Sequence, residues 1–272
     1  MTAALYLVSA SCRAVLSLFE GWHPLASLTL ISILTGIGML WVFRRVSNQA
    51  AIRRAKSHLQ AHLYELRLYA DEPVLIWRAQ RDLLAANLRY LRLMLKPAVI
   101  LTIPMVLALV QLDAFYGRQP IEVGAPALVT VQMKEAIDPS TPPPALEVPD
   151  GLAVESPAVR VMAEGQVVWR VRPAREASGA LRIRLRGGVV EKNIVSGGGP
   201  RYLTARRASS PGDVFWDPGE RAIEGGSIDW IEVAYPPAEA GLWSFRFHWL
   251  VWFVVISLGA AWMLKGRFGV AL

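Results

Sequence analysis

Two uncharged apolar segments enclose a strongly basic segment in the first half of the chain, and this arrangement restricts the fold more than any other feature. Residues 24–43 span roughly the 30 Å hydrocarbon core of a bilayer if they are helical. Residues 97–112 are also apolar and contain Pro104, which is tolerated in a span when neighbouring groups satisfy the freed carbonyl. A last apolar segment, residues 247–264, has tryptophans near both ends, where aromatic side chains favour the membrane interface. The sequence therefore predicts an integral membrane protein with three transmembrane helices, at residues 24–43, 97–115 and 246–264.

The basic residues predict the orientation of these spans. Lys and Arg far outnumber acidic residues in 44–96, whereas residues 1–23 contain only Arg13. The positive-inside rule then puts 44–96 in the cytoplasm and the N-terminus outside. Three spans leave residues 265–272, with Lys265 and Arg267, in the cytoplasm as well. We therefore expect a multi-pass protein of the cell (inner, cytoplasmic) membrane, with residues 116–245 outside.

The net charge of +7 is concentrated in the cytoplasmic segment, because residues 114–245 are nearly balanced in charge. A basic surface beside a membrane attracts anionic lipids, and the ribosome is a second candidate partner for it. The residues that begin this surface are Arg44, Arg45, Arg53, Arg54 and Lys56.

Residues 1–23 predict an amphipathic helix that lies in the membrane interface. Ser9, Arg13, Ser17 and Glu20 recur at spacings of three and four and leave apolar residues around the rest of the helix. Cys12 is the single cysteine of the chain, so no intramolecular disulfide can form.

Residues 44–96 predict an antiparallel helical hairpin in the cytoplasm. Asp71, Glu72 and Pro73 predict the turn, because Asp can cap a helix and Pro suits its first turn. One apolar face on each helix follows the spacing of three and four. These faces comprise Ile52, Ala55, Leu59, Leu63, Leu66 and Tyr69, and then Trp77, Leu84, Leu88, Leu91 and Leu95. His58 and His62 lie one helical turn apart, but no third ligand accompanies them, so we expect no metal site.

Residues 116–245 predict an all-β, sandwich-like domain. Short segments of alternating apolar and polar residues are separated by glycines and prolines, as expected for half-buried antiparallel strands. These segments are residues 127–133, 166–171, 180–186, 189–195 and 228–235.

This region contains no pattern that indicates catalysis. Ser209 and Ser210 have no histidine partner in the region, and the glycines 197–199 indicate a loop, not a phosphate-binding motif. Arg182, Arg184 and Arg186 share one strand face, where Glu191 and Glu232 are candidate ion partners across the sheet. We expect no enzymatic activity, no cofactor and no small-molecule substrate.

The first 118 residues and the last span together resemble the YidC/Oxa-type membrane protein insertases, in the three-span, abbreviated branch. The resemblance rests on the interfacial helix, Gly21-Trp22, a first span, the basic hairpin after residues 44–49, and a second span with Pro97 and Pro104.

The resemblance implies a polar intramembrane groove that helps client transmembrane segments to insert or fold, because a hydrated path lowers the cost of moving polar groups through hydrocarbon. Candidate groove residues are Thr29, Ser32 and Thr35 on the first span and Thr102 and Gln111 on the second. The alternative is that these hydroxyls bond carbonyls of their own helix and that Gly36 and Gly38 permit close helix packing.

Two other functions remain open at this stage. The chain can be a noncatalytic accessory subunit of a larger membrane complex, which binds partners through the β domain and the hairpin. It can also be a membrane-anchored sensor, although no recognisable signalling domain follows the last span.

Overall fold

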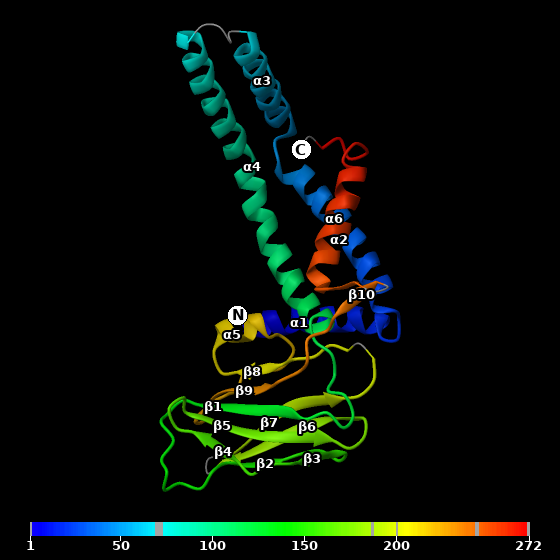
Figure 1. Cartoon of the computed structure of the whole chain (residues 1–272), viewed down its shortest axis with the longest axis vertical. Helices are drawn as coiled ribbons and strands as arrows, with labels where there is room; N and C mark the ends of the chain where they lie inside the picture. Colours follow the sequence, from blue (N-terminus) through cyan, green and yellow to red (C-terminus); the bar gives the residue numbers. More distant parts are fainter. Residues whose placement is uncertain (1, 69–72, 186–187, 200, 243–244, 271–272) are drawn as a thin grey trace. The chain divides into compact units, whose positions relative to one another are not determined.

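The computed structural model describes residues 2–68, 73–185, 188–199, 201–242 and 245–270. The chain forms two compact units, one made of Met1–Ser27 with Ala108–Trp249 and the other of Leu28–Leu107 with Leu250–Leu272. The first unit holds the β-strands, and the second holds most of the long helices (Figure 1).

Two antiparallel sheets dominate the first unit. The larger has the strand order β3-β5-β1-β9-β8, with β4 also paired to β5, and the smaller has the order β2-β6-β7. A separate hairpin is formed by β10 and β11. The strands are β1 (Ala127–Met133), β2 (Ala145–Glu147), β3 (Leu152–Val154), β4 (Val159–Val161), β5 (Gln166–Pro173), β6 (Ala177–Leu185), β7 (Gly188–Ser196), β8 (Arg206–Ala208), β9 (Ile228–Val233), β10 (Ala240–Leu242) and β11 (Phe245–Phe247).

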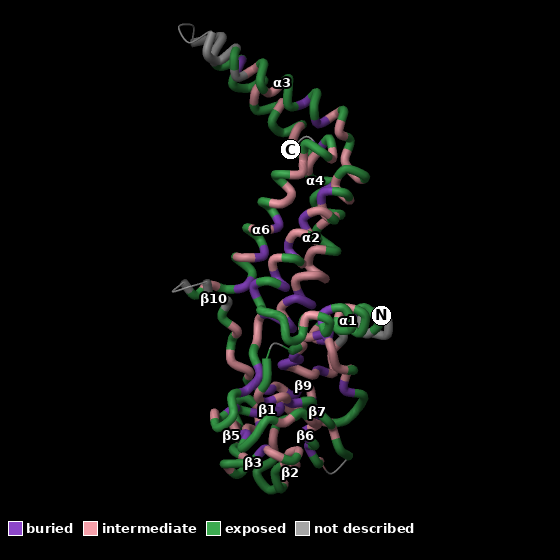
Figure 2. Tube along the Cα trace, turned by 90° about the vertical axis from the view of Figure 1, so that its right-hand side faces the viewer, coloured by how far each residue is buried: buried purple, intermediate pink, exposed green. Residues whose placement is uncertain are grey.

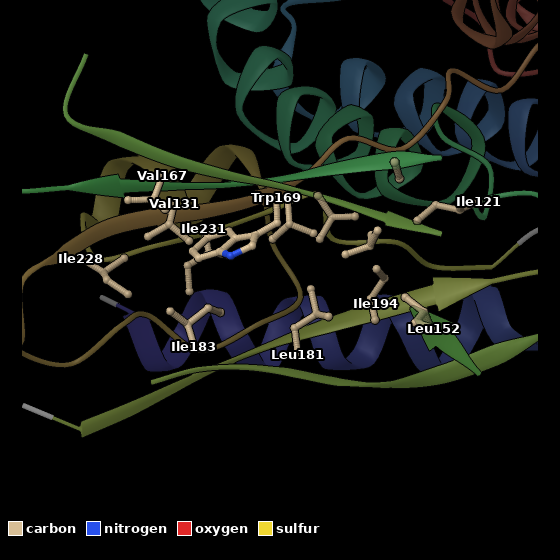
Figure 3. Close-up of a cluster of buried hydrophobic side chains, with 14 of the residues drawn as sticks. Ile121, Val131, Leu152, Val167, Trp169, Leu181, Ile183, Ile194, Ile228 and Ile231 are labelled. Atoms are coloured by element: carbon tan, nitrogen blue, oxygen red, sulfur yellow. The ribbon is translucent and has the colours of Figure 1, made fainter. Parts of the chain in front are cut away.

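The core of this unit lies between the two sheets, as a sandwich requires. On β5, Val167, Trp169 and Val171 are buried, and on β6 Leu181 and Ile183 have no exposed surface. Figure 3 shows these side chains converging between the sheets. The alternation in the sequence thus correctly predicts β1, β5, β6, β7 and β9, whereas the short strands β2, β3, β4, β8, β10 and β11 were not predicted. Each fully buried aliphatic side chain contributes roughly 1.5–3 kcal/mol.

The arginines of β6 lie on the outer face of the smaller sheet and are paired. Arg182 Nε donates to Glu191 Oε1 at 3.0 Å, and Arg184 Nε lies 2.6 Å from Glu147 Oε1. The expected partner Glu232 instead accepts from Arg206 of β8. Arg186 lies outside the described residues.

The helical elements are α1 (Thr2–Leu16), the 3₁₀ turn η1 (Ser17–Phe19), α2 (Pro24–Val46), α3 (Gln49–Leu68), α4 (Pro73–Tyr116), α5 (Pro211–Trp216) and α6 (Trp249–Leu264). Asn48 caps α3, because its Oδ1 accepts from the Ala51 amide at 3.0 Å. The turn expected at residues 71–73 falls at the start of α4, and Asp71 and Glu72 are outside the described residues.

Among the described residues, two helices are long and apolar enough to cross a membrane, α2 and the stretch Trp77–Tyr116 of α4. The third predicted span forms α6, a shorter apolar helix of 16 residues. One unbroken helix, α4, joins the second half of the predicted hairpin to the second apolar segment and contains both Pro97 and Pro104. The boundary predicted at residue 97 is therefore not a break in the backbone.

The structure corrects the predicted packing face of α4. Ile52 and Ala55 of α3 are buried as expected, but the side of α4 that is covered carries Ala79, which is buried, and Leu83 and Ala86, which are half-buried. The residues of the predicted face, Trp77, Leu84, Leu88, Leu91 and Leu95, are exposed. Figure 2 shows exposed, intermediate and buried positions along the tube. The helix has two apolar stripes, and the one with small alanines is the one that permits a close approach.

Candidate functional site

The polar residues of α2 are satisfied by neighbouring groups. Ser32 is fully buried and its Oγ donates to the Leu28 carbonyl one turn earlier at 2.6 Å. Thr29 Oγ1 accepts a hydrogen bond of 2.9 Å from the Trp252 indole of α6. Thr35 is half-buried. On α2, Ser32 thus has the partner in its own helix that the alternative interpretation expected, whereas the Thr29–Trp252 bond joins α2 to α6.

The two predicted groove residues of α4 have different surroundings. Thr102 is exposed, and its Oγ1 donates to the Ala98 carbonyl at 2.9 Å. Gln111 belongs to the first unit, where its Nε2 donates to Ser9 Oγ at 3.1 Å and its Oε1 accepts from the Tyr202 hydroxyl at 2.6 Å. Gln111 is therefore a buried link between α1, α4 and the β region.

A close contact between α2 and α6 is made at Gly36. A Cβ atom at this position would lie 2.5 Å from the Ser257 carbonyl oxygen, whereas at Gly38 nothing lies within 4 Å. Gly36 therefore allows the two backbones to touch, as small residues do between helices in lipid. With the Thr29–Trp252 bond, this contact shows that α2 and α6 touch at more than one point.

In contrast, α4 keeps a long apolar surface uncovered. We define the α4 apolar face as its exposed large apolar residues Trp77, Leu84, Leu88, Leu91, Leu95, Val99, Ile100 and Ile103. Trp77 is 73% exposed and Ile103 is 66% exposed, so the face continues from the hairpin into the most apolar stretch of the helix. Only 11% of that stretch is buried, against 33% for α2. The spacing of three and four in the sequence was the signal for this face, but the spacing does not say whether a face is covered.

Basic residues follow one edge of the α4 apolar face. At 100° per residue, Arg81 and Arg92 project next to the leucines, and Arg78, Arg89 and Lys96 lie further around the same side of the helix. All five are exposed, and so are the predicted basic-surface residues Arg44, Arg45, Arg53, Arg54 and Lys56. The guanidinium of Arg45 lies 5.0 Å from the centre of the Trp41 ring, a cation–π distance.

Two side-chain hydrogen bonds in the first unit connect the end of α4 to the starts of α2 and α6. The Tyr116 hydroxyl at the end of α4 donates to Ser27 Oγ at the start of α2, at 2.9 Å. The Trp249 indole at the start of α6 donates to Asp113 Oδ1 at 3.2 Å. These bonds join residues far apart in sequence, so no local pattern could have predicted them.

An ion pair next to these residues involves a half-buried carboxylate. Arg118 Nη1 lies 3.1 Å from Asp217 Oδ1. Burial raises the pKa of Asp217, and the Arg118 guanidinium opposes that rise. The chain segment that follows α4 is thereby tied to the loop after α5.

The helix α1 buries some of its residues against the rest of the first unit and leaves others exposed. Its polar Ser9 is buried against Gln111, and Arg13 Nη2 donates to the Gly219 carbonyl at 2.5 Å. The apolar residues Leu7, Val15 and Leu18 are exposed. Leu16 is buried together with Ser9, while the exposed apolar residues of α1 and η1 suit a lipid interface.

No group of three His, Cys, Asp or Glu within the described ranges is arranged to hold a metal ion. Comparison with protein-family models, with curated proteins and with solved structures found no match.

Proposed function

We propose that the chain is an insertase-like membrane protein biogenesis factor, which helps client transmembrane segments to insert or fold. In this proposal α2, α4 and α6 span the inner membrane, the hairpin of α3 and the first half of α4 is cytoplasmic, and the β region is outside. The resemblance of the layout to YidC/Oxa-type insertases and the basic residues beside the spans support this topology.

The α4 apolar face is the observation that carries the proposal. It extends from Trp77 in the hairpin to Ile103 in the proposed span, with Arg81 and Arg92 beside it, and the described residues leave it exposed. An apolar client helix that contacts this face can remain shielded from water while it moves from the cytoplasmic side toward the bilayer. Because α2 packs on α6 through Gly36, the side of the bundle available to a client is α4.

The client surface in this proposal is the α4 apolar face, and it is not formed by the five polar residues that the sequence suggested. Ser32 and Gln111 are buried and bonded, so of the five candidates only Thr102 is exposed on the helix that carries the face. The basic residues along the edge of α4 add an electrostatic attraction to this apolar surface. They attract anionic lipid headgroups and acidic residues that flank a client segment.

Site-specific photocrosslinking during synthesis of a small membrane protein tests the proposal. Probes at Leu88, Leu95 and Ile103 are expected to crosslink the nascent apolar segment. A probe at Asp82 is the matched control for Leu88 and Leu95, because this residue is exposed on the same helix but projects more than about 100° away from both leucines around the helix axis. Equal crosslinking from Asp82 and Leu88, or none from any position, would refute a client surface.

A noncatalytic subunit of a larger membrane complex is the second candidate. It is favoured by the spacing of Leu84, Leu88, Leu91 and Leu95, which repeats every three or four residues as in helices that pair permanently. In that case the same probes would crosslink one mature membrane protein, and nascent chains would not be labelled.

A further inference from the structure

A polar cavity of about 410 Å³ lies in the first unit, between the end of α1, the strands β6 and β7, and the loop after β7. Its wall includes two cationic and two anionic side chains, Arg13 and Arg201 with Glu20 and Glu220, together with Tyr202 and Tyr235. Cavities of this size hold small molecules or the polar part of a larger one.

The carboxylate of Glu220 is fixed at the wall of this cavity. Its side chain is only 7% exposed, and Oε1 accepts from Lys192 Nζ at 2.7 Å and from the Asn193 amide at 3.3 Å. The described residues give Oε2 no hydrogen bond, yet no fully buried polar atom in them lacks a partner. Oε2 therefore reaches solvent, and it is an acceptor held in place for a donor in the cavity.

The cationic side of the cavity is positioned by α1. Arg13 is fixed by its bond to the Gly219 carbonyl, and its guanidinium stacks 5.0 Å from the centre of the Tyr202 ring. Arg201 and Glu20 are exposed, and the described residues place no ion partner on either. One wall therefore offers donors to an anion, while Glu220 offers an acceptor to a cation.

We propose that this cavity binds a phosphate ester that carries a primary amine, as in the headgroup of a phosphatidylethanolamine. The phosphate accepts hydrogen bonds from Arg13 and Arg201, which bind phosphate through paired N–H groups, and the ammonium donates to Glu220, with Glu20 adding a second negative charge.

The position of the cavity favours a lipid as the source of this group. Arg13 and Glu20 belong to the helix and turn whose apolar residues Leu7, Val15 and Leu18 point outward, an arrangement suited to the membrane interface. Glu20 also lies just before Pro24, where α2 begins. The binding site depends on a membrane location, but it does not depend on client insertion.

The test uses the full chain in nanodiscs of mixed lipids, followed by release into detergent and native mass spectrometry of the retained lipid. Phosphatidylethanolamine is expected to be retained over both phosphatidylglycerol, which lacks the amine, and phosphatidylcholine, whose quaternary amine cannot donate to Glu220. Arg201→Gln is expected to reduce retention of phosphatidylethanolamine on the order of tenfold, since a charge-assisted bond to the phosphate is lost. Glu20→Gln is expected to reduce the preference for phosphatidylethanolamine over phosphatidylglycerol, since a negative charge near the amine is lost. Both residues are exposed, so these variants keep the fold.

Arg182→Gln is the matched control, because it removes an exposed, ion-paired arginine of the same unit outside the cavity, and it is expected to retain the lipid as the wild type does. Equal retention of phosphatidylglycerol, or an Arg201→Gln variant with unchanged retention of phosphatidylethanolamine, would overturn the proposal. Competition by soluble glycerophosphoethanolamine at concentrations equal to those of the lipid would overturn the assignment to a membrane lipid.

Discussion

Lys192 is a fully buried cation in the β region, and its replacement by methionine tests how the loop that carries Glu220 is held. The Lys192 side chain has no exposed surface, and Nζ donates to the Thr204 carbonyl at 2.5 Å, to Glu220 Oε1 at 2.7 Å and to the Asn193 carbonyl at 3.3 Å. Burial lowers the pKa of the Lys192 ammonium, and the neighbouring Glu220 carboxylate opposes that shift.

Lys192→Met keeps most of the side-chain volume and removes the charge. The Glu220 carboxylate is then left without its cation in a nearly buried position, and breaking a buried pair in this way costs about 3–5 kcal/mol of unfolding free energy. The double variant Lys192→Met with Glu220→Gln also removes the unpaired charge. In the double variant the Thr204 carbonyl still lacks its donor, which costs about 1–3 kcal/mol. The double variant is therefore expected to be about 2 kcal/mol more stable than Lys192→Met.

Hydrogen exchange of the β6 and β7 amides in the full chain measures these changes as local unfolding free energies. Arg182→Met is the matched control, because it breaks an exposed pair with Glu191 and is expected to cost less than about 1 kcal/mol. The reasoning is refuted if Lys192→Met costs no more than the control, or if the double variant is no more stable than Lys192→Met.

Two other predictions concern the helix pair and the half-buried carboxylate. Gly36→Ala places a methyl group against the Ser257 carbonyl and is expected to destabilise the α2–α6 pair by about 1–3 kcal/mol, while Gly38→Ala, which meets nothing, is not; thermal unfolding in detergent compares them. Because burial raises the pKa of Asp217 in the folded chain, the folded state binds its proton more tightly than the unfolded state. The contribution of Asp217 to the free energy of unfolding therefore falls as pH rises from the ordinary aspartate pKa to the raised one. Unfolding measurements on the wild type and on Asp217→Asn across that pH range are expected to show this fall in the wild type only.

The strands and the helices were predictable from sequence because their signals are local. Val167, Trp169 and Val171 alternate with polar residues, and a period of two fixes both the strand and its buried face. The apolar segment of residues 24–43 similarly indicates a helix, since a long uncharged run has few other stable structures.

Which face of each helix is buried was only partly predictable from the sequence. The sequence of α4 has two apolar stripes, and the larger side chains suggested that the stripe with Leu88 packs on α3. The structure covers the stripe with Ala79 instead and leaves Leu88 54% exposed. Likewise, the polar side chain of Gln111 suggested a groove residue. Its hydrogen bond to Ser9, about a hundred residues away in sequence, instead links α4 to α1.

The sequence by itself determined the order of apolar, basic and β-rich segments, the inner face of the strands and the distribution of charge, because these depend on neighbours within a few residues. Only the tertiary structure decided that Lys192 meets Glu220, that Gly36 meets Ser257, and that Arg13 and Glu220 share a cavity. The physical reason is that these contacts form between segments distant in the chain, where chain geometry and the satisfaction of buried polar groups select the partner.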